Sequence, residues 1–94
     1  MKFIITTDWR KTNGSSLVGL IEADYHTLVR AFGEPDREDQ DKVQAEWRLE
    51  FEDGTIATNY DWKRYGSSPE SCRDWHVGGF GVQSLVAVKE VLGL

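Results

Sequence analysis

The sequence predicts a single small α+β domain, residues 1–94, in which helices pack on one face of an antiparallel sheet. Three observations predict this class. Apolar and polar residues alternate on both sides of Asp53-Gly54, a pattern typical of a β-hairpin. Residues 25–32 carry an apolar stripe at helical spacing, and residues 82–92 carry a second one. The predicted element order is β-β-α-β-β-β-α.

The first third of the chain predicts two strands and a helix. Residues 2–9 and 16–21 are expected to pair as an N-terminal hairpin around a polar turn. Asp24 is typical of a helix N-cap, and Tyr25, Leu28, Val29 and Phe32 follow at i, i+3, i+4 and i+7. Gly33 and Pro35 then end the helix.

The hairpin spans residues 46–63. With Asp53-Gly54 as a two-residue type I′ turn, Phe51 is expected opposite Ile56, and Trp47 opposite Tyr60, all on the apolar face. Trp47 and Tyr60 are therefore expected in the core.

The other face of the hairpin is expected to carry charge. The same register places Glu46 opposite Asp61, and two carboxylates that close would form an acid/base pair. Arg48 and Lys63 lie diagonal to these carboxylates. The pattern therefore favours a structural charge lattice over an acid/base pair.

The remaining segments complete the order. Residues 34–41 are expected to form a charged, solvated connector, and residues 64–73 a second loop. Residues 74–77 predict a short strand that ends at Gly78-Gly79. The final helix is expected to bury a broad apolar stripe: Val82, Leu85, Val86, Val88, Val91 and Leu92.

The charge balance restricts the class of partner. The net charge is −5, so the chain lacks the basic surface that general nucleic-acid binding requires. An acidic surface is compatible with a basic protein partner, with mimicry of nucleic acid, and with ordinary solubility.

The chain also gives indications of its compartment. Cys72 is the only cysteine, so no intrachain disulfide forms and a cytoplasmic location is expected. The N-terminus has only three consecutive apolar residues, which predicts no signal peptide, and no segment is long enough to span a membrane.

Catalytic and metal-binding patterns are weak. Cys72, Asp74 and His76 lie at i, i+2 and i+4, and would share one face of a strand. Only Arg73 adds positive charge beside the thiol, and one cysteine with two distant histidines is too few for zinc. We therefore expect no enzyme, no catalytic residues, no metal and no cofactor.

Aromatic, cationic and glycine residues near the strand ends predict a binding site instead. Aromatic side chains in such positions often line pockets or interfaces, although core packing is the alternative for each. Gly78-Gly79, just before a helix, favours a close-packed strand-to-helix turn, with amides that cradle an anion as the alternative. The candidate ligand- or partner-binding residues are Trp9, Trp62, Arg64, Tyr65, Arg73, Trp75, His76, Gly78 and Gly79.

Three segments carry a family resemblance: residues 32–35 (Phe-Gly-Glu-Pro), residues 45–63, and residues 75–79 (Trp-His-Val-Gly-Gly). In them the chain resembles a family of small, largely uncharacterised proteins encoded by bacteriophages. The resemblance implies an accessory phage protein that acts in the cytoplasm of a bacterial host, but it implies no catalytic residues.

Two functions are therefore expected. The first is non-enzymatic binding and inhibition of a host bacterial protein, with counter-defence as one such role. The alternative is sequestration of a small phosphate-bearing ligand such as a nucleotide, by aromatic residues and the Gly-Gly turn. A homodimer is a further option, since a small chain can complete a site by symmetry.

Overall fold

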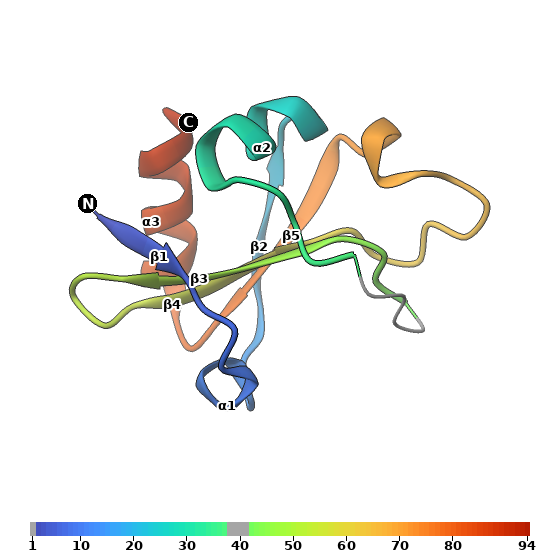
Figure 1. Cartoon of the computed structure of the whole chain (residues 1–94). Helices are drawn as coiled ribbons and strands as arrows, with labels where there is room; N and C mark the ends of the chain where they lie inside the picture. Colours follow the sequence, from blue (N-terminus) through green and yellow to red (C-terminus); the bar gives the residue numbers. More distant parts are fainter. Residues whose placement is uncertain (1, 38–41) are drawn as a thin grey trace.

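The computed structural model describes residues 2–37 and 42–94, and the connector residues 38–41 lie outside this description. Its centre is a five-stranded antiparallel sheet with strand order β1-β3-β4-β5-β2 (Figure 1). The strands are β1 (Phe3–Ile5), β2 (Ser16–Glu22), β3 (Glu46–Phe51), β4 (Ile56–Tyr60) and β5 (Asp74–Gly79). The helices are α1 (Trp9–Thr12), α2 (Tyr25–Phe32), α3 (Val82–Leu92) and a 3₁₀ turn (Pro69–Ser71).

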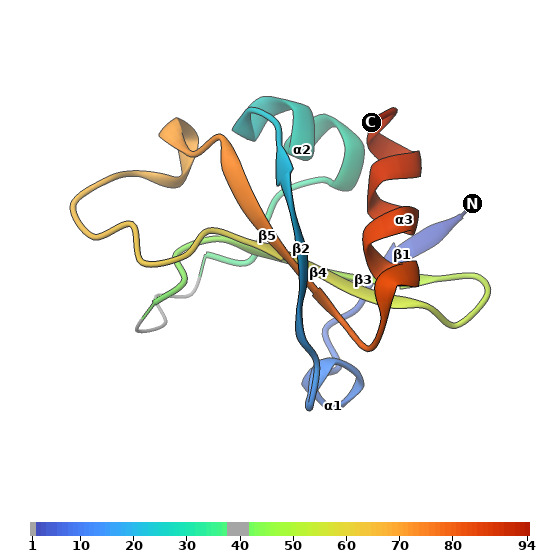
Figure 2. The same ribbon diagram turned by 180° about the vertical axis from the view of Figure 1, so that it is seen from behind.

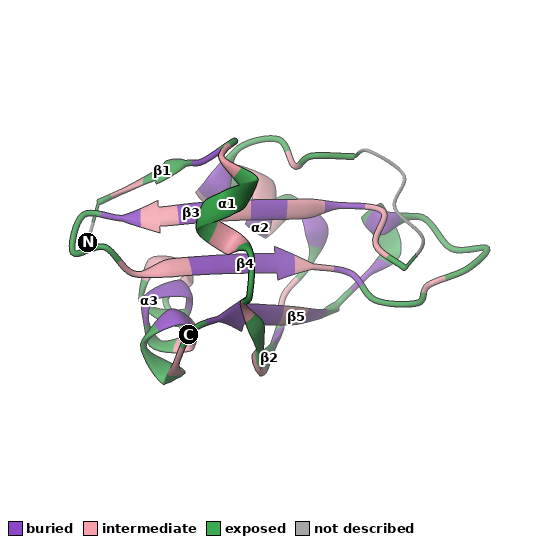
Figure 3. Ribbon diagram, turned by 90° about the horizontal axis from the view of Figure 1, so that it is seen from below, coloured by how far each residue is buried: buried purple, intermediate pink, exposed green. Residues whose placement is uncertain are grey.

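The helices form separate layers. Both α2 and α3 lie on one side of the sheet, above it in Figure 1 and again in the reverse view of Figure 2. The short α1 lies on the other side and crosses β3 and β4 (Figure 3). The α+β class and the position of the two expected helices are confirmed, and α1 is an additional element.

The expected N-terminal hairpin is wrong. The strands β1 and β2 occupy opposite edges of the sheet, where β1 pairs with β3 and β2 pairs with β5. The chain between them forms α1 and crosses below the sheet (Figure 1). Because both strands find partners distant in sequence, local turn chemistry did not indicate their pairing.

The expected register of the central hairpin is also wrong, by one residue. The backbone N–H of Phe51 donates to the carbonyl of Thr55 at 2.8 Å, and that of Gly54 donates to the carbonyl of Phe51 at 2.9 Å. Three residues, 52–54, therefore form the loop, and Gly54 has φ = +90°. This is a type I turn followed by a left-handed glycine, not the two-residue type I′ turn.

The one-residue shift turns every side chain of β4 to the opposite face. Trp47 is opposite Asn59, while Glu46 is opposite Tyr60. Asn59 and Asp61 are consequently buried beneath the helices. The placement of Tyr60 in the core and the Glu46–Asp61 pair are corrected on these grounds.

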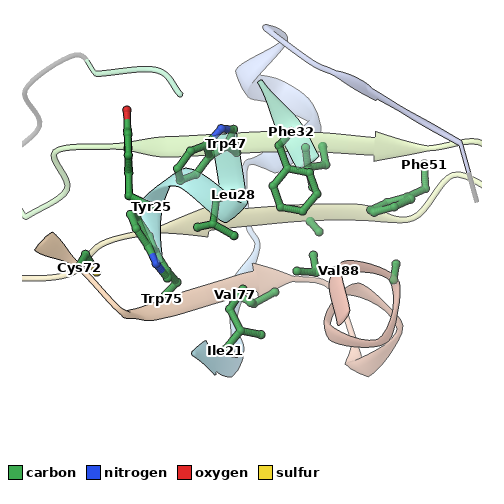
Figure 4. Close-up of a cluster of buried hydrophobic side chains, with 13 residues drawn as sticks. Ile21, Tyr25, Leu28, Phe32, Trp47, Phe51, Cys72, Trp75, Val77 and Val88 are labelled. Atoms are coloured by element: carbon green, nitrogen blue, oxygen red, sulfur yellow. The ribbon is translucent and has the colours of Figure 1, made fainter. Parts of the chain in front are cut away.

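The core lies between the sheet and the two larger helices (Figure 4). Trp47 and Trp75 meet edge to face with ring centroids 5.4 Å apart, and Leu28 from α2 packs over them. Both indole N–H groups are hydrogen-bonded, Trp47 to the carbonyl of Gly33 at 2.7 Å and Trp75 to that of Ala23 at 2.9 Å. Two of the four tryptophans are therefore structural.

The helix bounds agree with the sequence. Asp24 caps α2 by accepting from the backbone N–H of Thr27 at 2.8 Å, and Gly33 ends the helix with φ = +87°. The bounds of α3 are as expected, but its buried face differs. Val88 is buried, whereas Val82 and Val86 are exposed.

Candidate functional site

The side of the sheet opposite α2 and α3 is termed the open face. Near its middle, α1 covers the sheet, and Lys11 of α1 forms an ion pair with Glu50 of β3 at 2.7 Å. Beyond α1 lies one uncovered row of side chains, each opposite the next on neighbouring strands. The row runs Glu46 (β3), Tyr60 (β4), His76 (β5) and Leu20 (β2).

Aromatic rings form the centre of this row. Trp62, just beyond β4, stacks on His76 with centroids 5.8 Å apart and an interplanar angle of 27°. Tyr60 contacts both rings, at 6.1 Å from Trp62 and 5.5 Å from His76. Together with Leu20, which is 57 % exposed, these three rings form an apolar surface. The surface lies on the side of the sheet that α2 and α3 do not cover.

Glycine keeps the surface flat beside these rings. Gly78 lies opposite Thr58, and a Cβ atom added to it would come 2.5 Å from Thr58 Oγ1 and 3.5 Å from Tyr60 Cε1. A side chain at position 78 would therefore displace the Thr58 hydroxyl group.

Two lysines adjoin the aromatic cluster. The Nζ atoms of Lys42 and Lys63 lie over the Trp62 ring, 5.7 and 5.8 Å from its centroid. Such cation–π contacts stabilise an ammonium group close to an aromatic surface. Lys42 and Lys63 are termed the lysine pair below.

Buried hydrogen bonds hold the two loops that carry the lysine pair. The Oδ1 atom of Asp61 accepts from the backbone N–H groups of Gln44 and Ala45, at 2.8 and 3.0 Å. The backbone N–H of Lys63 donates to the carbonyl of Lys42 at 2.9 Å. Asp61 is fully buried, so this attachment is shielded from water.

The Glu46 end of the row is a charge cluster. Arg48 donates to Glu46 at 2.7 Å and to Asp36 at 3.0 Å. Burial raises the pKa of Glu46, opposed by the charge of Arg48, and burial also raises the pKa of Tyr60. The charge lattice expected on this face is therefore wrong in its membership: Arg48 pairs with Glu46 and Asp36, whereas Asp61 is buried on the helix side and Lys63 lies over Trp62.

Burial lowers the pKa of His76. Its ring lies between Tyr60 and Trp62, where an imidazolium ion loses hydration. The neutral ring is therefore the form that this surface favours at neutral pH.

The structure brings together only part of the expected binding set. Trp62, His76 and Gly78 lie on the open face, and Trp9 lies exposed on α1, the helix that crosses the middle of this face. Trp75, by contrast, is fully buried in the core.

The other members of the set lie elsewhere. Gly79 is buried on the helix side, against Ser84 of α3. Both glycines belong to β5, which has a strand on each side, so their amides serve the sheet and not a helix N-terminus. Arg64, Tyr65 and Arg73 lie in the loop region 64–73, where Arg64 donates to Ser71 Oγ at 2.7 Å.

The weakly predicted thiol set is not assembled on this surface. Cys72 is buried in the core cluster, its Sγ donates to the carbonyl of Asp74, and burial raises its pKa. Among the described residues, no group of three or more His, Cys, Asp or Glu is placed to hold a metal ion.

Sequence reasoning missed three residues of this surface. Tyr60 was misplaced by the register error, and Leu20 was assigned only to a strand. Lys42 contacts a ring 20 positions away, so nothing local indicated its role. Reading Asp53-Gly54 as the end of a three-residue loop would have recovered Tyr60.

Comparison with known proteins gave no match: no family model, no curated protein and no solved structure is significantly similar to the chain. None of the described helices is long and apolar enough to cross a membrane. The resemblance to phage-encoded proteins stays a prediction.

Proposed function

We propose that this is a non-enzymatic protein that binds a bacterial host protein through its open face and inhibits it. The observation that carries this proposal is a surface of two exposed side chains, Trp62 and Leu20, and two half-buried rings, Tyr60 and His76. It lies on a sheet whose other face is covered by helices. Aromatic residues are enriched in protein interfaces because rigid rings bury much area at little cost in side-chain entropy. The phage resemblance supplies the expectation of a bacterial host.

The surrounding groups support the same function. Charged groups adjoin the apolar centre: Arg48 and Glu46 lie beside Tyr60, and the lysine pair lies over Trp62. A polar rim around an aromatic centre is the usual anatomy of a protein–protein interface.

A matched pair of substitutions tests this proposal. Leu20 on the open face and Val86 on α3 are each 57 % exposed, so glutamate at either position adds the same charge at similar exposure. Tagged protein expressed in bacteria is isolated with its bound proteins. We expect a stoichiometric partner with the native chain and with Val86→Glu, and at least about a tenfold loss with Leu20→Glu.

Two results would refute the proposal. One is the absence of any stoichiometric protein partner. The other is a partner that Leu20→Glu retains and Val86→Glu loses, since that would move the interface to α3.

A second candidate function is binding of a small phosphate-bearing ligand. Trp62 and the lysine pair place an aromatic ring beside two positive charges, a combination suited to a nucleotide. A panel of linear and cyclic nucleotides tests it by thermal shift, because ligand at a hundredfold its Kd stabilises a protein by about 2.7 kcal/mol. No shift across the panel would remove this candidate.

A further inference from the structure

The lysine pair differs from the cations of this chain that form ion pairs. Arg10, Lys11, Arg37 and Arg48 each form an ion pair with a carboxylate. Within residues 2–37 and 42–94, no carboxylate is in ion-pair contact with either lysine of the pair. Two ammonium groups thus share one ring in a chain whose acidic residues outnumber its basic ones, 16 to 11.

The backbone holds this pair in place at an energetic cost. Lys63 has φ = +53°, the left-handed region that L-residues other than Asn and Asp rarely adopt, and it is the only described non-glycine residue with positive φ. Its N–H bond to the Lys42 carbonyl and the buried Asp61 acceptor fix the two loops together. Strained backbone that surrounding bonds maintain is characteristic of ligand-binding positions.

The surroundings of Trp62 distinguish between possible occupants. The His76 ring stacks against Trp62, and the two ammonium groups lie over the Trp62 ring. The site therefore offers two positive charges to a ligand. A nucleotide base that stacked on Trp62 would have to displace either the His76 ring or the ammonium groups. Tyr60 contacts the Trp62 ring, and Leu20 lies opposite His76, so this part of the surface suits an apolar side chain.

From these observations we infer that the lysine pair binds the carboxylates of an acidic segment of the partner protein, whose adjoining apolar side chain packs on Tyr60, His76 and Leu20. This inference rests on the proposed function, and it names the chemistry of the partner at one end of the open face. Charge complementarity supports it: the lysine pair has no carboxylate from the described chain, and a partner segment would supply it.

Two synthetic peptides that differ only in the sign of their charge provide the test. They are acetyl-Glu-Asp-Glu-Leu-Phe-amide and acetyl-Lys-Arg-Lys-Leu-Phe-amide, each titrated into the ¹⁵N-labelled full chain and followed by NMR. We expect the acidic peptide to shift the Trp62 indole, Lys63 and His76 resonances in a saturable manner. The basic peptide is expected to leave these resonances unchanged.

Variants locate the effect at the lysine pair. Lys42→Gln/Lys63→Gln is expected to weaken binding of the acidic peptide by at least about tenfold. Lys42→Arg/Lys63→Arg is expected to retain it, because the charge is kept. Lys2→Gln/Lys89→Gln removes the same charge from exposed positions before β1 and on α3, and is expected to bind like the native chain.

Several outcomes would overturn the inference. These are equal shifts with the basic peptide, no shift with the acidic one, or tighter binding of ATP at the same resonances. A stoichiometric partner that Leu20→Glu loses but the lysine-to-glutamine variant keeps would overturn this inference alone and leave the proposed function standing.

Discussion

Asn59 and Asp61 are both fully buried on the helix side of the sheet, but their polar atoms differ in how they are satisfied. Asp61 accepts two backbone hydrogen bonds through Oδ1, although its Oδ2 has no partner within the described chain, and thereby joins residues 44 and 45 to the end of β4. Neither amide atom of Asn59 has a hydrogen-bond partner within the described chain. A buried polar group without a partner destabilises the folded state.

Replacing Asn59 with valine is therefore expected to stabilise the protein. Asn59→Val removes the unpaired amide and places a β-branched residue in a central strand, for an expected gain of about 1–3 kcal/mol in the free energy of unfolding. Asp61→Val is the matched control, and it should destabilise, because two backbone N–H groups lose their acceptor. Urea denaturation measures both, and a less stable Asn59→Val would contradict this account of position 59.

His76 predicts a pH dependence of stability. Because burial lowers its pKa in the folded state, the unfolded chain binds this proton more tightly. Its contribution is fully present above the unfolded pKa of about 6.5 and is lost as the pH falls below it.

Replacement of His76 should reduce the loss of stability at low pH. We expect the melting temperature of His76→Gln to fall less than that of the native chain between about pH 7.5 and pH 5.5. His26→Gln, which replaces the other histidine of the chain on the exposed surface of α2, is measured alongside. Equal losses in the native chain and His76→Gln would show that His76 does not titrate differently on folding.

At the scale of elements, local signals were sufficient for α2 and insufficient for the sheet. Asp24 and Gly33 determine the two ends of α2 within ten residues, and both bounds were predicted. The hairpin was predicted with the wrong register, because Asp53-Gly54 fits both a two-residue turn and the end of a three-residue loop. The positions of β1 and β2 depend on contacts with distant strands, which no local pattern encodes.

The same limit applies to the candidate site. Trp62 and His76 were predicted because aromatic residues at strand ends often face partners. Tyr60 was assigned to the core because the predicted register was wrong by one residue. Trp75 was wrongly assigned to the binding site, because its burial depends on packing against α2. The lysine pair depends on the attachment of residues 42–45 to Asp61, which is a tertiary contact.

The turn itself gives a prediction at this scale. Gly54 has φ = +90° and no atom within 4 Å of an added Cβ, so alanine there is unfavourable for backbone reasons alone. Gly54→Ala is expected to cost about 1–2 kcal/mol, and Gly54→Asn less, since asparagine tolerates positive φ. Chemical denaturation compares the two, and an alanine variant as stable as the native chain would contradict the left-handed turn.

At the scale of the whole molecule, the layer arrangement creates the surface that we propose binds a partner. Both larger helices cover the same side of the sheet, and α1 has only four residues with which to cover the other side. The exposed rings therefore follow from the architecture as much as from the side chains. A short domain with one helix layer leaves half of its sheet available for a partner.

Photo-crosslinking tests the central claim, that the open face binds a protein, most directly. A benzoyl-phenylalanine side chain is introduced at position 20 or at position 86, which have the same exposed fraction of 57 %, and the expressing bacteria are irradiated. The account predicts a discrete adduct with a bacterial protein from position 20 and none from position 86. Adducts from position 86 alone, or from neither position, would contradict it.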